Sequence, residues 1–103
     1  MKVRVTGKNY SQEVLRSRLP VLVEFFAVWC AKCAMMADIV DDLAEEYDGL
    51  VKVCQIDIDE SVDLASEFDI EIVPTFVVFR NGKPVSAANG VLDKQVLVEM
   101  MET

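Results

Sequence analysis

Two cysteines separated by two residues, Cys30 and Cys33, are the side chains of this sequence best suited to covalent chemistry. The apolar segment before them, Val21 to Val28, is typical of a buried strand, and Ala34 to Tyr47 has the periodicity of an amphipathic helix. Thiols at a strand-to-helix junction lie beside the free N–H groups and the positive dipole end of the helix, which favour a thiolate. Because the thiolate is the nucleophile of disulfide exchange, the pair predicts a dithiol that forms and opens a disulfide.

The two thiols have different predicted roles. Cys30 is the candidate attacking thiol, because it lies closest to the helix N-terminus and near the positive charge of Lys32. Cys33 is the candidate resolving thiol, one helical turn further along. A pair of inert core cysteines is one alternative, and a non-catalytic binding module or a soft-metal carrier using Cys30, Cys33 and Met35 is another. A metal site would need further ligands, and the sequence has no second cysteine pair at this spacing.

The three cysteines and the absence of histidine argue against several other classes of site. An odd number of cysteines does not suit a framework of structural disulfides, and Cys–His proteases, Cys2His2 zinc sites and c-type haem attachment all need histidine. The formal net charge of −8 argues against nucleic-acid or anionic-membrane partners and would suit a partner with a positive docking face. We therefore expect no metal site and no nucleic-acid partner.

Length and hydropathy predict one domain over residues 1–103. With 103 residues, of which 52% are hydrophobic, the chain is long enough for one core and too short for two. Its apolar runs are far shorter than a membrane span, and the first residues, Met1 to Thr6, alternate like a strand and carry no signal-peptide pattern. We therefore expect a cytoplasmic monomer with no membrane partner.

The remaining elements follow one another with short connections. Strands are expected at Lys2 to Thr6, Val21 to Val28, Val51 to Asp57, Phe76 to Arg80 and Pro84 to Ala88, and helices from Asn9 to about Arg18, Ala34 to Tyr47, Ser61 to Phe68 and from near Asp93. The continuous apolar run of Val21 to Val28 indicates a strand buried on both faces, and Asn81-Gly82 predicts a two-residue hairpin. The pattern predicts an α/β fold, with a central mixed five-stranded sheet flanked by four helices on both faces.

Some local features have plain structural interpretations. Asn9 is predicted to cap the first helix, with Gln12 in the capping-box position. Cys54 lies among apolar strand residues, which predicts a buried structural thiol and not a third catalytic one. Met35 and Met36 are interpreted as part of the buried stripe of their helix.

Several motifs, in the same order, resemble the thioredoxin family over essentially the whole chain. Leu22 to Cys30 is similar to the active-site strand of the family, Val73 to Phe76 to its cis-proline loop, and Arg80 to Lys83 to its hairpin. Gly90 falls where the family has a glycine near the active site. The chain departs from the family pattern at Ala31-Lys32 (typically Gly-Pro), Glu24 (usually a buried Asp), Gln55 (in many members a Lys that pairs with that acid) and Asp38 (in many members a helix-kinking Pro).

The resemblance implies a thioredoxin fold and a thiol–disulfide oxidoreductase that reduces protein disulfides through Cys30 and Cys33. It implies that Glu24 is buried with a raised pKa and exchanges a proton with Cys33; a glutamate turned outward is the alternative. It also implies that Pro74 is cis and faces the dithiol, and that a substrate pairs with the backbone near Val73 by β-augmentation. The implied substrate-binding residues are Trp29, Ala31, Lys32, Val73, Pro74, Thr75 and Gly90, although Trp29 could instead be an ordinary core residue.

The same resemblance implies the partners. A thioredoxin reductase using NADPH and a flavin would regenerate the dithiol, so this chain would bind no cofactor itself, and disulfide-containing proteins would be the substrates. A disulfide oxidant or isomerase-like member is the alternative within redox chemistry. Lys32 precedes the second cysteine, where isomerases carry a polar residue, and a positive charge there stabilises the reduced form and makes the couple less reducing.

Overall fold

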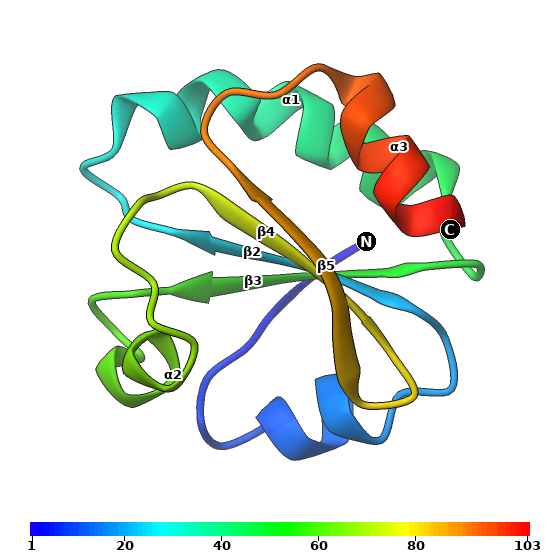
Figure 1. Cartoon of the computed structure of the whole chain (residues 1–103), viewed down its shortest axis with the longest axis horizontal. Helices are drawn as coiled ribbons and strands as arrows, with labels where there is room; N and C mark the ends of the chain where they lie inside the picture. Colours follow the sequence, from blue (N-terminus) through cyan, green and yellow to red (C-terminus); the bar gives the residue numbers. More distant parts are fainter.

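The computed structural model describes residues 1–103, and a five-stranded sheet in the order β1-β3-β2-β4-β5 forms its centre (Figure 1). The strands are β1 (Lys2–Arg4), β2 (Val21–Phe26), β3 (Lys52–Asp57), β4 (Thr75–Arg80) and β5 (Lys83–Asn89). Strands β1, β3 and β2 run parallel, whereas β4 is antiparallel to both β2 and β5. The predicted mixed sheet and its closing hairpin are therefore confirmed.

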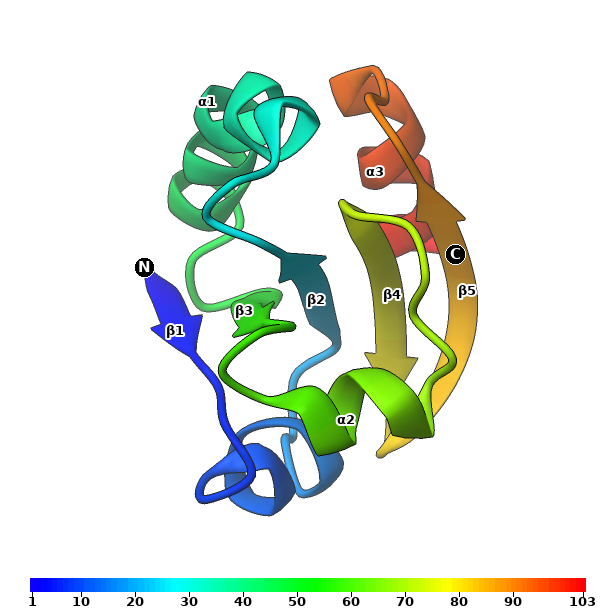
Figure 2. The same ribbon diagram turned by 90° about the vertical axis from the view of Figure 1, so that its left-hand side faces the viewer.

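Helices cover both faces of the sheet, as predicted (Figures 1 and 2). Helices α1 (Ala31–Glu46) and α3 (Lys94–Glu102) pack on one face, where Leu43 and Leu97 enter a core cluster with Leu22 of β2. A short π-helix, η1 (Ser11–Leu15), and α2 (Val62–Glu67) cover the other face. None of these helices has the length and apolarity needed to cross a membrane.

Strand β2 is buried on both faces because its side chains alternate between the two cores. Leu22 points to the α1 side, while Val23 and Phe25 belong to the cluster on the η1 and α2 side. The strand ends at Phe26 and not at Val28 as predicted, because the chain turns there: the N–H of Cys30 donates to the carbonyl of Ala27. This early end brings the dithiol out of the sheet and onto the start of α1.

The hairpin between β4 and β5 has the predicted turn. Asn81 and Gly82 both have positive φ, of 53° and 78°, as a type I′ turn requires. At Gly82 a Cβ would lie 2.6 Å from the carbonyl oxygen of Leu15, so a larger residue would collide with η1 as well as strain the backbone.

The first helix is shorter than predicted, and Asn9 does not cap it. The side chain of Asn9 instead accepts a 2.8 Å hydrogen bond from the N–H of Thr6 and donates a 3.0 Å bond to the carbonyl of Arg4. Because the amide is used to fold the chain back after β1, the helix begins only after Tyr10 and ends at Leu15, without a side-chain cap. The capping box predicted with Gln12 is therefore wrong.

Candidate active site

Cys30 occupies the N-cap of α1, so the helix begins at Ala31 and not at Ala34 as predicted. Its Sγ accepts a 3.1 Å hydrogen bond from the N–H of Cys33, the bond that a capping side chain makes in the first helical turn. This donor and the positive end of a long helix both support negative charge on the sulfur of Cys30. The predicted placement of a cysteine pair at a helix N-terminus is confirmed.

Cys33 belongs with Ala27 and Cys30 to a small apolar cluster, against which Val73 packs, and both cysteines are buried. Burial raises the pKa of the Cys33 thiol to about 12, and its hydrogen bond with Cys30 adds to the rise. At neutral pH this sulfur is therefore a thiol, and it must lose a proton before or while it attacks another sulfur.

The two thiols differ in what they face. An open groove of about 410 Å³ has Trp29 to Lys32 as one wall and Glu71 to Val73 as the other, and Cys30 is the cysteine that lines it. Cys33 instead lines a second open pocket of about 220 Å³, which Cys30 shares. Cys30 is the one residue that lines both the groove and this pocket.

Glu24 lines that pocket, together with Gln55 and both cysteines. It is only 3% exposed, so the alternative of a glutamate turned outward is wrong. Burial raises the pKa of its carboxyl, although the hydrogen bond from Gln55 acts in the opposite direction. Glu24 therefore holds a proton more readily than an exposed glutamate does, which agrees with the expected direction.

Trp29 is 67% exposed at the rim of the groove, which makes the interpretation as a core residue wrong. Its Nε1 donates a 2.7 Å hydrogen bond to Oδ2 of Asp59. Asp57, at the end of β3, positions the segment that carries Asp59. It accepts a 2.8 Å hydrogen bond from the N–H of Asp59 and a 3.4 Å bond from Nη2 of Arg4. The sequence analysis missed Asp59. The sequence could have predicted this contact, because Trp29 follows β2, Asp59 follows β3, and the carboxyl ends of these parallel strands lie at the same edge of the sheet.

The loop before β4 forms the other wall, and its Val73–Pro74 peptide bond is cis, as predicted. The thiol of Cys30 lies 3.5 Å from the carbonyl oxygen of Val73, to which it donates. The N–H of Gly90 donates a 2.9 Å bond to the carbonyl of Pro74, and Gly90 has a φ of +89° that a side chain would strain. Gly90 therefore lies beside Pro74 but does not line the groove.

The other predicted binding residues divide into two groups. Ala31 and Lys32 are exposed on the first turn of α1 and line the groove. Thr75 does not line it, and its hydroxyl donates to the carbonyl of Ile72, which secures the turn into β4. Two groove residues that the sequence analysis did not single out are Glu71 and Ile72, which immediately precede the cis-proline motif.

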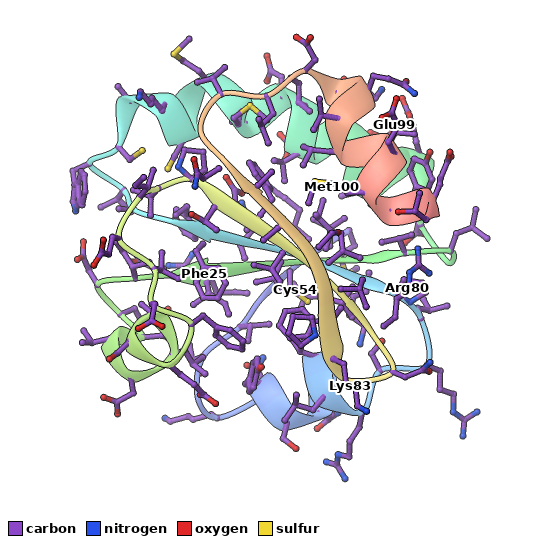
Figure 3. The ribbon with its side chains drawn as sticks, in the orientation of Figure 1. Phe25, Cys54, Arg80, Lys83, Glu99 and Met100 are labelled. Atoms are coloured by element: carbon purple, nitrogen blue, oxygen red, sulfur yellow. The ribbon has the colours of Figure 1, made fainter.

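Cys54 is fully buried on the opposite face of the sheet, in the cluster that contains Phe25 (Figure 3). Burial raises the pKa of its thiol to about 12, so the prediction of a buried structural thiol is confirmed. Met36 belongs to the core as expected, but Met35 is 65% exposed, so its assignment to the buried stripe is wrong. No group of three or more histidine, cysteine or acidic side chains is placed to hold a metal ion.

Known proteins resemble this chain along its length. A family model described as Thioredoxin matches residues 1–103. Thioredoxin 1 of Nostoc sp. is 39% identical over 99 residues, which cover 96% of this chain and 92% of that relative. Thioredoxin of Rickettsia felis is 39% identical over 99 residues, covering 96% and 94% of the two chains. Thioredoxin M5, chloroplastic, of Oryza sativa subsp. japonica is 39% identical over 95 residues, covering 92% and 55%. The chain therefore belongs to the thioredoxin family, and its Cys30–Cys33 dithiol makes it a thiol–disulfide oxidoreductase.

Proposed function

We propose that this protein reduces disulfides of other proteins in two exchange steps. The thiolate of Cys30 attacks one substrate sulfur, forming a mixed disulfide and releasing the other substrate sulfur as a thiolate. Cys33 then attacks Sγ of Cys30, releases the second substrate thiol and leaves a Cys30–Cys33 disulfide. Two electrons and two protons pass from the protein to the substrate. The observation that carries this assignment is that Cys30 lines the groove next to Val73, whereas Cys33 lines only the pocket that it shares with Glu24.

Glu24 is proposed to take the proton of Cys33 in the second step. The pKa of Cys33 is raised to about 12, so attack at neutral pH needs a base. Glu24 lines the same pocket of about 220 Å³ as both cysteines, so its carboxylate would take the proton directly or through a water molecule. The raised pKa of Glu24 suits a group that both accepts this proton and returns it.

The substrate is proposed to bind as an extended segment along the loop wall. No intramolecular hydrogen bond uses the N–H of Val73, and its carbonyl faces the thiol of Cys30. A substrate strand paired with Val73 would place its disulfide at Cys30, with Trp29, Ala31 and Lys32 contacting it from the other wall. In this proposal Pro74, Thr75 and Gly90 support the binding loop from behind.

Cysteine substitutions test the order of the two steps. In Cys33→Ser the first step remains and the second is blocked, so the protein should accumulate as a mixed disulfide with a substrate such as insulin. In Cys30→Ser no such adduct should form at a comparable rate, and neither variant should catalyse insulin reduction by dithiothreitol. Adduct formation by Cys30→Ser but not by Cys33→Ser would reverse the assigned roles.

Glu24→Gln tests the proton transfer separately. The first step should proceed at nearly the normal rate, whereas release from the mixed disulfide should slow by roughly tenfold to hundredfold at neutral pH. Equal slowing of both steps would instead indicate a general structural effect of the substitution.

Family membership supports the proposed partners. We propose that residues 1–103 form one thioredoxin domain that works as a monomer in a reducing compartment such as the cytoplasm. A thioredoxin reductase would supply electrons from NADPH through its flavin, and this chain would hold no cofactor. Oxidation of NADPH that requires the reductase, this protein and a protein disulfide together is the expected result.

A further inference from the structure

Each wall of the groove beside Cys30 carries one charged side chain that forms no ion pair within the chain. Glu71 is exposed on the loop wall next to Ile72, and Lys32 is exposed on the first turn of α1. Neither Glu71 nor Lys32 forms an ion pair within the chain, so both charges are available to a bound segment.

A second carboxylate lies next to the groove, on the side of Trp29. Asp59 does not line the groove, but it accepts a 2.7 Å bond from the indole N–H of Trp29, which does, and no cation of the chain pairs with Asp59. Glu71 therefore lines the groove opposite the ammonium of Lys32, and Asp59 adds a second negative charge beyond Trp29, in a protein whose formal net charge is −8. A charged rim around an apolar contact surface favours partners of the opposite charge and speeds their encounter.

We infer that Glu71 is a specificity-determining residue that selects disulfide segments carrying lysine or arginine close to the reacting cysteine. The apolar side chains of Trp29 and Ile72, which are 67% and 54% exposed, would contact the apolar part of the same segment. The inference rests on the proposed function, in which the reduced dithiol gives two electrons and two protons to the substrate disulfide. Asp59 contributes to the same preference, but its bond to Trp29 makes it a less clean site for mutation.

Two synthetic peptides provide the probe. They have the same length and the same internal disulfide, and differ only in that arginine or glutamate flanks one cysteine. Their reduction by the reduced protein is followed by acid quenching and chromatography. The Arg peptide should be reduced about fivefold faster than the Glu peptide at about 20 mM ionic strength, and the ratio should approach one at about 0.5 M, because salt screens exposed charges.

Charge reversal at Glu71 should abolish or invert this ratio, and Glu71→Gln should give an intermediate value. Using the ratio of the two peptides cancels any effect of the substitution on the reactivity of Cys30 itself. Glu99→Lys is the matched control, because it makes the same change in net charge at an exposed position on α3 that forms no ion pair (Figure 3). This variant should keep most of the preference.

The outcomes separate the inference from the proposed function. If the wild-type protein reduces neither peptide, the proposed function fails. If it reduces both at equal rates, or if Glu71→Lys keeps the full preference, the inference is overturned while the function stands. Equal loss of preference in Glu71→Lys and Glu99→Lys would also overturn it, since net charge and not this groove would then be responsible.

Discussion

Gln55 donates a 2.8 Å hydrogen bond from Nε2 to Oε1 of Glu24, across the parallel strands β3 and β2. The two residues are direct register partners, so the bond exists only because the strands pair in this alignment. It stabilises the ionised carboxylate, whereas burial destabilises it, and burial has the larger effect on the pKa of Glu24. The position that holds a lysine in many thioredoxins thus contributes a neutral donor here.

Two substitutions of Gln55 should shift the pKa of Glu24 in opposite directions. Gln55→Met removes the donor and should raise this pKa above the wild-type value, whereas Gln55→Lys supplies a charged donor and should lower it. The pH dependence of release from the mixed disulfide, and the carboxyl carbon shift of Glu24 in NMR, would report the order. An unchanged pKa across the three proteins would show that the bond has no influence on Glu24.

Replacing Glu24 should change how stability depends on pH. The folded-state pKa of Glu24 is raised above its ordinary value of 4.5. Its contribution to the free energy of unfolding is therefore fully present below that pH and is lost as the pH rises through the folded-state pKa. Glu24→Gln can still accept the bond from Gln55 and cannot ionise. Its stability relative to wild type should therefore increase with pH, by about 1.4 kcal/mol per unit of pKa shift.

Urea unfolding of the two reduced proteins from about pH 4.5 to 8 would measure this difference. Cys33 stays protonated in both folded proteins because its pKa is about 12, and it ionises equally in both unfolded chains, so its contribution cancels in the difference. A stability difference that stays constant across these pH values would contradict the raised pKa of Glu24.

Asp59 should control the mobility of Trp29. Asp59→Ala removes the acceptor of the indole N–H, so the ring should move more freely, and reduction of insulin should slow by a few fold. Trp29 is the only tryptophan in the chain, so the anisotropy decay of tryptophan fluorescence reports this site alone. Asp59→Asn keeps an oxygen acceptor and should resemble wild type; identical behaviour of the two variants would argue against the hydrogen bond as the cause.

Lys32 should make the Cys30–Cys33 couple less reducing. Its exposed charge near Cys30 favours the thiolate of the reduced form, so Lys32→Glu should make the reduction potential more negative, by about 20 mV. Equilibration with dithiothreitol or glutathione buffers would measure it. Lys83→Glu is the control, because it makes the same charge change on the hairpin, away from the dithiol (Figure 3). An unchanged or less negative potential in Lys32→Glu would contradict the role of this charge. Separately, a clearly oxidising potential of the wild-type protein would favour the alternative of a disulfide oxidant or isomerase.

Cys54 should matter for stability and not for redox chemistry. Cys54→Ala removes a fully buried sulfur from the cluster that contains Phe25 and should lower the free energy of unfolding by about 1–2 kcal/mol. The potential of the dithiol and the rate of insulin reduction should stay at wild-type values, because the sheet separates Cys54 from Cys33. Loss of activity in a folded Cys54→Ala protein would instead indicate a third functional thiol.

Local sequence patterns were sufficient to predict most of the fold. The apolar run of β2 required burial on both faces, and Asn81-Gly82 required a tight hairpin because both residues tolerate positive φ. The spacing of Cys30 and Cys33 placed a dithiol at the start of a helix. In each case the pattern lies within a short stretch of residues, so it can be recognised from the sequence alone.

Only the tertiary structure decided which distant side chains meet. The bond between Glu24 and Gln55 depends on strand register, and the contact of Trp29 with Asp59 depends on two strand ends reaching one edge of the sheet. Asn9 shows that a local choice can also be missed: it had a suitable type and position for a helix cap, yet its amide bonds to the backbone of the nearby Thr6 and Arg4, which competes with that role. Polar groups take the partners that folding brings within hydrogen-bonding distance, and for residues far apart in sequence that choice is made by packing.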